Sequence, residues 1–138
     1  MGEVVVNVEL ESAGDLALVA AGALAERDVR RLSLQIVVDT GASSLMLPQE
    51  IVDALGLPVV RTTRVQYADG RRESLLVAGP IALTVAGRSG NFDCIVGRRG
   101  VEPLLGQIVL ESLDLLVDCP AQRLVPRPES PDLSLYRL

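Results

Sequence analysis

The sequence predicts a mostly β domain of short strands and tight turns, and three observations carry this prediction. The chain has 138 residues, which is enough for one modest core and too few for two domains. Hydrophobic residues make up 49% of the chain and aromatic residues only 2%, so the apolar residues are mainly aliphatic, and many are β-branched. The 12 glycines and 8 prolines interrupt these aliphatic stretches at short intervals, as turns between strands require.

The first part of the chain is expected to form a β-hairpin. Apolar and polar residues alternate over residues 4–10, which is typical of an amphipathic strand. Residues 12–15 are rich in small and polar side chains and predict a turn, so the apolar residues 16–23 are expected to form the return strand. The charged residues 26–31 then connect this hairpin to the next strand.

A buried strand and a short helix follow. Residues 32–38 are apolar except for two polar positions, which favours a strand buried on both faces. Pro48 is placed to open a helix over residues 49–55, because proline is tolerated at a helix start. Gly56 ends this helix, and Pro58 lies where a helix commonly cannot continue.

Residues 62–85 predict a second hairpin. Asp69 and Gly70 lie at its centre, and this dipeptide favours a tight hairpin turn because glycine tolerates positive φ. The Gly79-Pro80 dipeptide is expected to break the returning strand, after which residues 81–85 alternate as a further strand.

The last third of the chain continues the same pattern. Residues 92–96 predict a buried strand, and residues 107–113 a second short helix. Short strands are expected at 115–117 and 123–125. These elements complete a single domain over residues 1–126 with its core at 33–125, and the proline-rich residues 127–138 are expected to form a loose or partner-dependent tail.

Composition excludes several classes of function. The chain contains no histidine, which removes Ser-His and Cys-His catalysis and imidazole-bound zinc or iron. Cys94 and Cys119 cannot form a thiolate zinc site by themselves. They are expected to be small buried hydrophobic residues, and a disulfide between them stays open as the alternative. We therefore expect no metal and no cofactor.

Charge and hydropathy set expectations about partners. The net charge is −5, and the 13 basic residues are all arginines scattered along the chain. Without a basic stripe or stacking aromatic side chains, we expect no nucleic-acid partner. No apolar stretch is long enough to span a membrane, and no signal peptide is evident. We expect a soluble, cytoplasmic protein with no membrane partner.

The most informative motif follows the strand at 32–38. Three apolar residues lead directly into Asp39, Thr40 and Gly41, and the small residues Ala42 and Ser43 come next. This order resembles the active-site turn of retropepsin-like aspartic proteases. Three further landmarks of that family occur in the expected order, and together the four cover roughly residues 33–125. They are Leu55-Gly56-Leu57, the Asp69-Gly70 hairpin, and Leu104-Leu105-Gly106 before a helix.

The resemblance implies a fold and an assembly. It implies a retropepsin-like closed β-barrel with two short helices and a β-hairpin flap. Aspartic protease chemistry needs two carboxylates, and the Asp-Thr-Gly signature occurs once in this chain. The resemblance therefore implies a homodimer in which each copy supplies one Asp39 as a catalytic residue.

The resemblance also implies a role for each residue near the motif. Thr40 is expected to hydrogen-bond across the dimer axis, and Gly41 to bond the carboxylates through its N–H. Ala42 and Ser43 are expected to pack under the turn. The remaining implied site residues line the cleft or form the flap. They are Val37, Tyr67, Ala68, Asp69, Gly70, Arg71, Leu104, Leu105 and Gly106.

Two features depart from the family pattern. The tip of the expected flap is charged, whereas the viral flaps are glycine-rich and apolar. Gln107 stands where viral members carry an arginine that braces the dimer.

Three other aspartates do not supply a second catalytic carboxylate. Asp93, Asp114 and Asp118 lack the Asp-Thr/Ser-Gly context and are expected to be solvated charges in turns or at strand ends.

The favoured function is a homodimeric aspartic endopeptidase that hydrolyses extended peptide segments in mildly acidic solution, by water activated between two Asp39 carboxylates. The alternative is a dimeric peptide-binding module on the same fold that cleaves slowly or not at all, because a fold does not guarantee chemistry. A third hypothesis is a monomeric β domain in which Asp39 merely forms an Asx turn.

Overall fold

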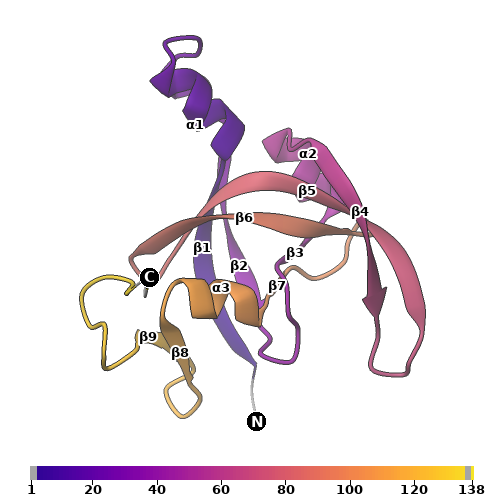
Figure 1. Cartoon of the computed structure of the whole chain (residues 1–138), viewed down its shortest axis with the longest axis vertical. Coiled ribbons are helices and arrows are strands. Elements are labelled where there is room, and N and C mark those ends of the chain that lie inside the picture. Colours follow the sequence, from indigo (N-terminus) through magenta and orange to yellow (C-terminus); the bar gives the residue numbers. More distant parts are fainter. Residues whose placement is uncertain (1–2, 136–137) are drawn as a thin grey trace.

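The computed structural model describes residues 3–135 and residue 138, and it confirms that the chain is mostly β. Strands account for 46% of the structure and helices for 18%. The described residues form nine strands, three short α-helices and one 3-10 helix (Figure 1). The strands are β1 (Val4–Ser12), β2 (Arg31–Val38), β3 (Met46–Pro48), β4 (Val59–Gln66), β5 (Arg72–Val85), β6 (Arg88–Gly97), β7 (Leu104–Leu105), β8 (Leu115–Asp118) and β9 (Arg123–Pro126). The helices are α1 (Ala13–Ala20), α2 (Gln49–Leu55) and α3 (Gln107–Ser112), and the 3-10 helix is η1 (Glu26–Asp28).

Seven strands form one sheet in the order β1-β2-β7-β3-β6-β5-β4. An additional antiparallel pairing joins β1 to β5, with Leu10 opposite Leu83. This pairing closes six of the strands into a ring and leaves β4 outside it as an edge strand. The structure thus shows a ring of strands where the resemblance implies a closed barrel.

The prediction of an N-terminal hairpin was wrong. Residues 13–20 form helix α1, where a turn and a return strand were expected. Ser12 caps this helix, and its Oγ accepts a hydrogen bond of 3.1 Å from the Asp15 N–H. The Asp15 carboxylate accepts three hydrogen bonds of 2.9 Å from the backbone and side chain of Arg30, which hold its pKa well below the usual range. Alanine and leucine then favour helix once the start is fixed.

Two strand predictions need correction. Strand β5 continues through Gly79-Pro80, with a shift in its register to β6 between Ala78 and Ile81. Proline has no N–H to donate to the ladder, and it fits here because the strand pairing is interrupted at this point. Strand β2 is not buried on both faces: of its eight residues only Ile36 and Val37 are buried.

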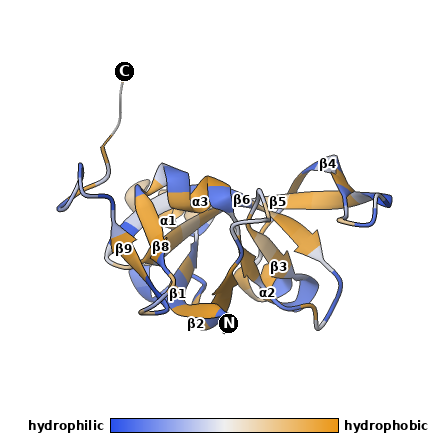
Figure 2. Ribbon diagram, turned by 90° about the horizontal axis from the view of Figure 1, so that it is seen from below, coloured by the Kyte–Doolittle hydropathy of each residue, from blue (hydrophilic) through white to orange (hydrophobic). Residues whose placement is uncertain are grey.

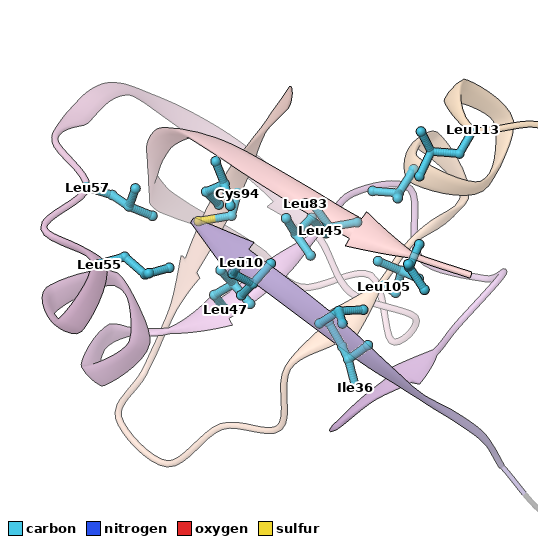
Figure 3. Packing of buried hydrophobic residues seen from close by; sticks show 14 of the residues in the cluster. Leu10, Ile36, Leu45, Leu47, Leu55, Leu57, Leu83, Cys94, Leu105 and Leu113 are labelled. Carbon is cyan, nitrogen blue, oxygen red and sulfur yellow. The ribbon is translucent and has the colours of Figure 1, made fainter. Parts of the chain in front are cut away.

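The core fills the ring and extends under α2 and α3. Its fully buried members come from most of the strands, and Figure 3 shows several of them packed together. The largest include Leu10, Ile36, Leu45, Leu47, Leu55, Leu83 and Leu105.

The C-terminal residues fold back onto the domain. Strands β8 and β9 pair as a separate two-stranded sheet. The buried guanidinium of Arg88 donates to the carbonyl oxygen of Leu113 at 2.9 Å and to that of Ser130. Residues 127–135 are therefore attached through a buried contact.

Both cysteines are free, so no disulfide joins them. Cys94 is buried as expected. The prediction for Cys119 was wrong, because this residue lies in the turn after β8 and is exposed. Within the described part of the chain, no helix is long and apolar enough to cross a membrane.

Candidate active site

The Asp-Thr-Gly turn begins where β2 ends, and β7 lies beside it. Strands β2 and β7 run parallel, with Val37 opposite Leu104 and Val38 opposite Leu105. The ladder continues one step further, since the Asp39 N–H donates to the Leu105 carbonyl oxygen at 3.0 Å. Two motifs that are far apart in the sequence are thereby brought together.

The turn fixes the carboxylate of Asp39. The Gly41 N–H donates to Oδ1 of Asp39 at 2.9 Å, and the Ala42 N–H donates to the Asp39 carbonyl oxygen at 3.1 Å. These bonds form an Asx-type turn in which one carboxylate oxygen is engaged by the backbone. Among the described residues, Oδ2 of Asp39 has no hydrogen-bond donor, so this oxygen is available to a substrate, a water or another carboxylate.

Helix α3 supports the turn from behind. The Gln107 N–H donates to the Ala42 carbonyl oxygen at 2.8 Å, and the Ile108 N–H donates to the Ser43 carbonyl oxygen at 2.9 Å. The first N–H groups of a helix have no partner within the helix, so the turn satisfies two of them. The turn and the helix are therefore one hydrogen-bonded unit.

Gly106 allows this close contact. A Cβ atom at position 106 would lie 2.7 Å from the backbone nitrogen of Ser44 and 2.8 Å from its carbonyl carbon, closer than real Cβ contacts. Because these are backbone atoms, no side-chain rotation can relieve the overlap. The glycine of Leu104-Leu105-Gly106 thus has a local steric cause.

Burial differs across the predicted turn residues. Val37 and Leu105 are buried, Leu104 and Ala42 are half-buried, and Asp39 is half-buried at the end of its strand. Thr40, Gly41 and Ser43 are exposed. The unit is anchored in the core on one side and open to solvent on the other.

The predicted flap residues lie together at the tip of the β4–β5 hairpin and are exposed. The Asp69 carboxylate accepts from the Arg71 N–H at 3.0 Å and from Arg71 Nε at 2.8 Å, which lowers the pKa of Asp69. The Arg71 guanidinium lies 4.8 Å from the centre of the Tyr67 ring. Ala68 and Gly70 complete the turn, which Figure 2 shows as a hydrophilic tip.

Tyr67 links this tip to the returning strand. Its hydroxyl donates to Oε2 of Glu73 at 2.6 Å, which lowers the pKa of Glu73 and raises that of Tyr67. The Arg98 guanidinium lies 3.5 Å from the other oxygen of the Glu73 carboxylate. The tip is thus organised by its own polar contacts.

The hairpin tip and the turn point toward the same end of the molecule (Figure 1), but they do not touch. Within the described residues, no hydrogen bond or ion pair joins residues 67–71 to residues 39–43. The base of the hairpin does approach the turn. There a cavity of about 90 Å³ is lined by Ser44, Arg61, Thr63, Val77, Asp93, Cys94 and Ile95.

None of these seven cavity residues was singled out from the sequence as a site residue, and three of them are polar groups close to the turn. Ser44 follows the small residues of the motif, and Arg61 and Asp93 face each other with 3.0 Å between Nη1 and Oδ2. Asp93 was expected to be a solvated charge; it is exposed, and it also pairs with the exposed Arg61 across the sheet. The sequence holds no local signal for this pairing, because Arg61 lies on β4 and Asp93 on β6, and β5 lies between these strands in the sheet.

The other chemical groups near the cavity do not offer a nucleophile. Burial in apolar surroundings raises the pKa of the Cys94 thiol to about 12, so it is not a thiolate at neutral pH. Within residues 3–135 and residue 138, no cluster of three or more side chains could hold a metal ion. The arrangement offers one backbone-held carboxylate beside an apolar floor.

Comparison with known families shows what the chain is similar to. The model of a family described as "Aspartyl protease" matches residues 25–109, which is more than half of the chain. The matched range contains the Asp39 turn, the β4–β5 hairpin and Leu104-Leu105-Gly106, and it begins after α1. No curated protein matches the chain.

Proposed function

Because the chain belongs to the aspartyl protease family, we propose that it is an endopeptidase that acts as a homodimer, with one Asp39 from each copy in a shared site. The observation that carries this proposal is a single Asp-Thr-Gly turn whose carboxylate keeps one oxygen free. Acid–base hydrolysis between two carboxylates needs a second such group. A second copy of the same turn supplies it.

The surroundings of Asp39 support this pairing. Thr40, Gly41 and Ser43 are exposed beside it, so a two-fold related turn can approach without displacing the core. Thr40 would then hydrogen-bond across the axis, in keeping with the resemblance. The hydrogen bonds from α3 to Ala42 and Ser43 keep the turn in place while its outer side meets the partner.

The chemistry follows from two like charges held close together. Both carboxylates cannot ionise at such a short separation, so the pair shares one proton. The ionised carboxylate accepts a proton from water while the water oxygen attacks the peptide carbonyl carbon. The protonated carboxylate donates its proton to the carbonyl oxygen. When the tetrahedral intermediate collapses, the amide nitrogen receives a proton and the C–N bond breaks, which yields a carboxylic acid and an amine.

The substrate is an extended peptide segment bound between the turn and the hairpin. Val37, Leu104 and Leu105 provide the apolar floor, and residues 67–71 at the hairpin tip close over the peptide and exclude water. An extended peptide can add its backbone to strand edges near the cleft. Apolar side chains next to the cleaved bond match the apolar floor.

Substitution of Asp39 tests the chemistry. The Asp39→Asn protein should cleave an unfolded protein substrate at mildly acidic pH at least about a hundredfold more slowly, because it lacks the acid–base group. Asp118→Asn is the matched control, since Asp118 is the last residue of β8 and its ion pair to Arg123 is long at 3.5 Å. Cleavage by the Asp39→Asn protein at the wild-type rate would refute the assignment.

The assembly is tested separately by sedimentation. The wild-type and Asp39→Asn proteins should both sediment as dimers at high concentration, because the substitution removes a charge and leaves the turn intact. A protein that sediments only as a monomer across the concentration range would exclude the shared site.

A further inference from the structure

The β4–β5 hairpin carries two arginines that have no carboxylate partner among the described residues, Arg64 and Arg72. The neighbouring arginines do have one: Arg61 pairs with Asp93, Arg71 with Asp69 and Arg98 with Glu73. Arg72 donates only to the amide oxygen of Gln66, at 3.3 Å. Two positive charges are thus left uncompensated on a chain whose net charge is −5.

The two arginines share one face of the hairpin. Arg64 lies opposite Ser74, and Gln66 lies opposite Arg72, so Arg64 and Arg72 are diagonal neighbours. Such neighbours are about 7–8 Å apart. A hollow of about 190 Å³ is lined by Arg64, Val65, Gln66 and Arg72.

This face is directed away from the proposed cleft. Side chains alternate between the two faces of a strand, and Arg61 and Thr63 line the cavity beside Ser44. Arg64 and Gln66 therefore point to the opposite side, where they are exposed. A peptide in the catalytic cleft would not contact them, so they form a separate surface, here called the outer hairpin face (Arg64, Gln66, Arg72 and Ser74).

The same strand also offers a free edge. Strand β4 ends the sheet order, so β5 is its one neighbour in the described sheet, and seven of its eight residues have a partner there. The strand contains neither proline nor glycine, and its backbone is regular after the irregularity at Val59 to Arg61. An exposed edge of this kind can pair with an extended segment of another chain.

We propose that the outer hairpin face and the free edge of β4 bind an extended acidic segment of the protein substrate, outside the catalytic cleft. The inference rests on the proposed protease function and deepens it, because it defines the substrate class as proteins with an acidic segment flanking the cleaved bond. The backbone of the segment pairs with β4, and its carboxylates meet the Arg64 and Arg72 guanidinium groups. The strand edge favours a peptide over a nucleic acid, whose bases would need aromatic platforms.

Binding is tested apart from catalysis on the Asp39→Asn protein. The probe is a fluorescent twelve-residue peptide with glutamate at alternate positions, and the reference peptide carries glutamine in place of each glutamate. Fluorescence anisotropy at low salt should show the acidic peptide binding about fivefold or more tightly, because two exposed charge pairs form. The preference should disappear at high salt.

Two variants locate the surface. Arg64→Gln with Arg72→Gln should abolish the preference for the acidic peptide. Arg27→Gln is the matched control, because Arg27 is an exposed arginine on η1 that also lacks a carboxylate partner among the described residues. In the active protein, the double variant should raise KM for a substrate with acidic flanks, and kcat should stay unchanged.

The outcomes separate this inference from the proposed function. A preference of less than fivefold, an equal loss in Arg27→Gln, or tighter binding of a single-stranded DNA of matched length would each overturn the acidic-segment site. Unimpaired cleavage by the Asp39→Asn protein would instead overturn the catalytic assignment and leave the anisotropy results unaffected.

Discussion

The Asp39 turn and the tip of the β4–β5 hairpin are both short loops with an aspartate and a glycine, yet they are held in opposite ways. The turn is bound to β7 and α3 through backbone hydrogen bonds and stands on the fully buried Leu105. The hairpin tip is exposed and is organised by contacts among its own side chains. One loop is fixed by the core, and the other is held by polar contacts between exposed side chains.

The difference fits a division of labour in a protease. A catalytic carboxylate has to be held in one position, and backbone hydrogen bonds from a core element do this. In the proposed enzyme the hairpin has to move to admit the peptide, and its tip makes no hydrogen bond to the turn that would prevent this among the described residues. The same difference predicts how substitutions in the two loops will behave.

The largest effect is expected from Gly106→Ala. The new Cβ would overlap backbone atoms of Ser44, so the turn and α3 would have to separate, which should lower the free energy of unfolding by about 3 kcal/mol. Urea denaturation measures the loss, and cleavage activity should fall with it. A loss below about 1 kcal/mol would show that the turn is less tightly held than its contacts indicate.

An effect of similar size is expected from Leu105→Ala. Leu105 is fully buried under the turn, so the cavity left by truncation should destabilise the protein by about 2–5 kcal/mol. The matched control in the hairpin is Leu76→Ala, because Leu76 is 43% exposed and should change the stability by less than about 0.5 kcal/mol. Equal losses of unfolding free energy in Leu105→Ala and Leu76→Ala would show that the turn and the hairpin do not differ in how they are anchored.

A smaller effect is expected from Gly70→Ala at the hairpin tip. Gly70 has a φ of +89° and open space around it, so the cost is conformational and should be about 1 kcal/mol. Gly70→Asn should recover much of the loss, because asparagine tolerates positive φ better than alanine does. If asparagine were no better than alanine in thermal unfolding, the conformational explanation would be wrong.

The smallest effect on the whole domain is expected from Tyr67→Phe, which removes the hydrogen bond to Glu73. That bond is the main reason that the pKa of Glu73 is lowered, so the pKa should rise toward its ordinary value in the variant. Since the folded pKa is the lower one, the bond stabilises the tip above the ordinary glutamate pKa, and this stabilisation is lost as the pH falls through the folded value. NMR titration of the Glu73 carboxyl measures the pKa, and identical values in both proteins would exclude the mechanism.

Local sequence signals predicted the elements around the site well. Asp69-Gly70 predicted the hairpin turn, and Gly56 ended α2 with a left-handed conformation as its position suggested. The Asp-Thr-Gly turn follows its strand as expected, and α3 begins directly after Leu104-Leu105-Gly106. These elements were predictable because each is specified by residues that are adjacent in the chain.

The errors came from interactions between residues that are distant in the sequence. Helix α1 was missed although Ser12 offers a local cap, and the contact of Asp15 with Arg30, fifteen positions further along, has no local signature. The continuity of β5 through Gly79-Pro80 depends on its neighbour β6. The pairing of β1 with β5, which closes the ring, has no local signature at all. The pair of Arg61 with Asp93 was not predicted, for the same reason.

Mixing of active and inactive subunits measures most directly whether two Asp39 carboxylates share one site. A fixed amount of wild-type protein is equilibrated with a ninefold excess of the Asp39→Asn protein, and the rate of cleavage is recorded. If both copies supply a carboxylate, nearly all wild-type chains pair with an inactive partner, and activity should fall to about one tenth. Activity that stays constant as the inactive protein is added would show that one chain is sufficient, and would contradict the shared site.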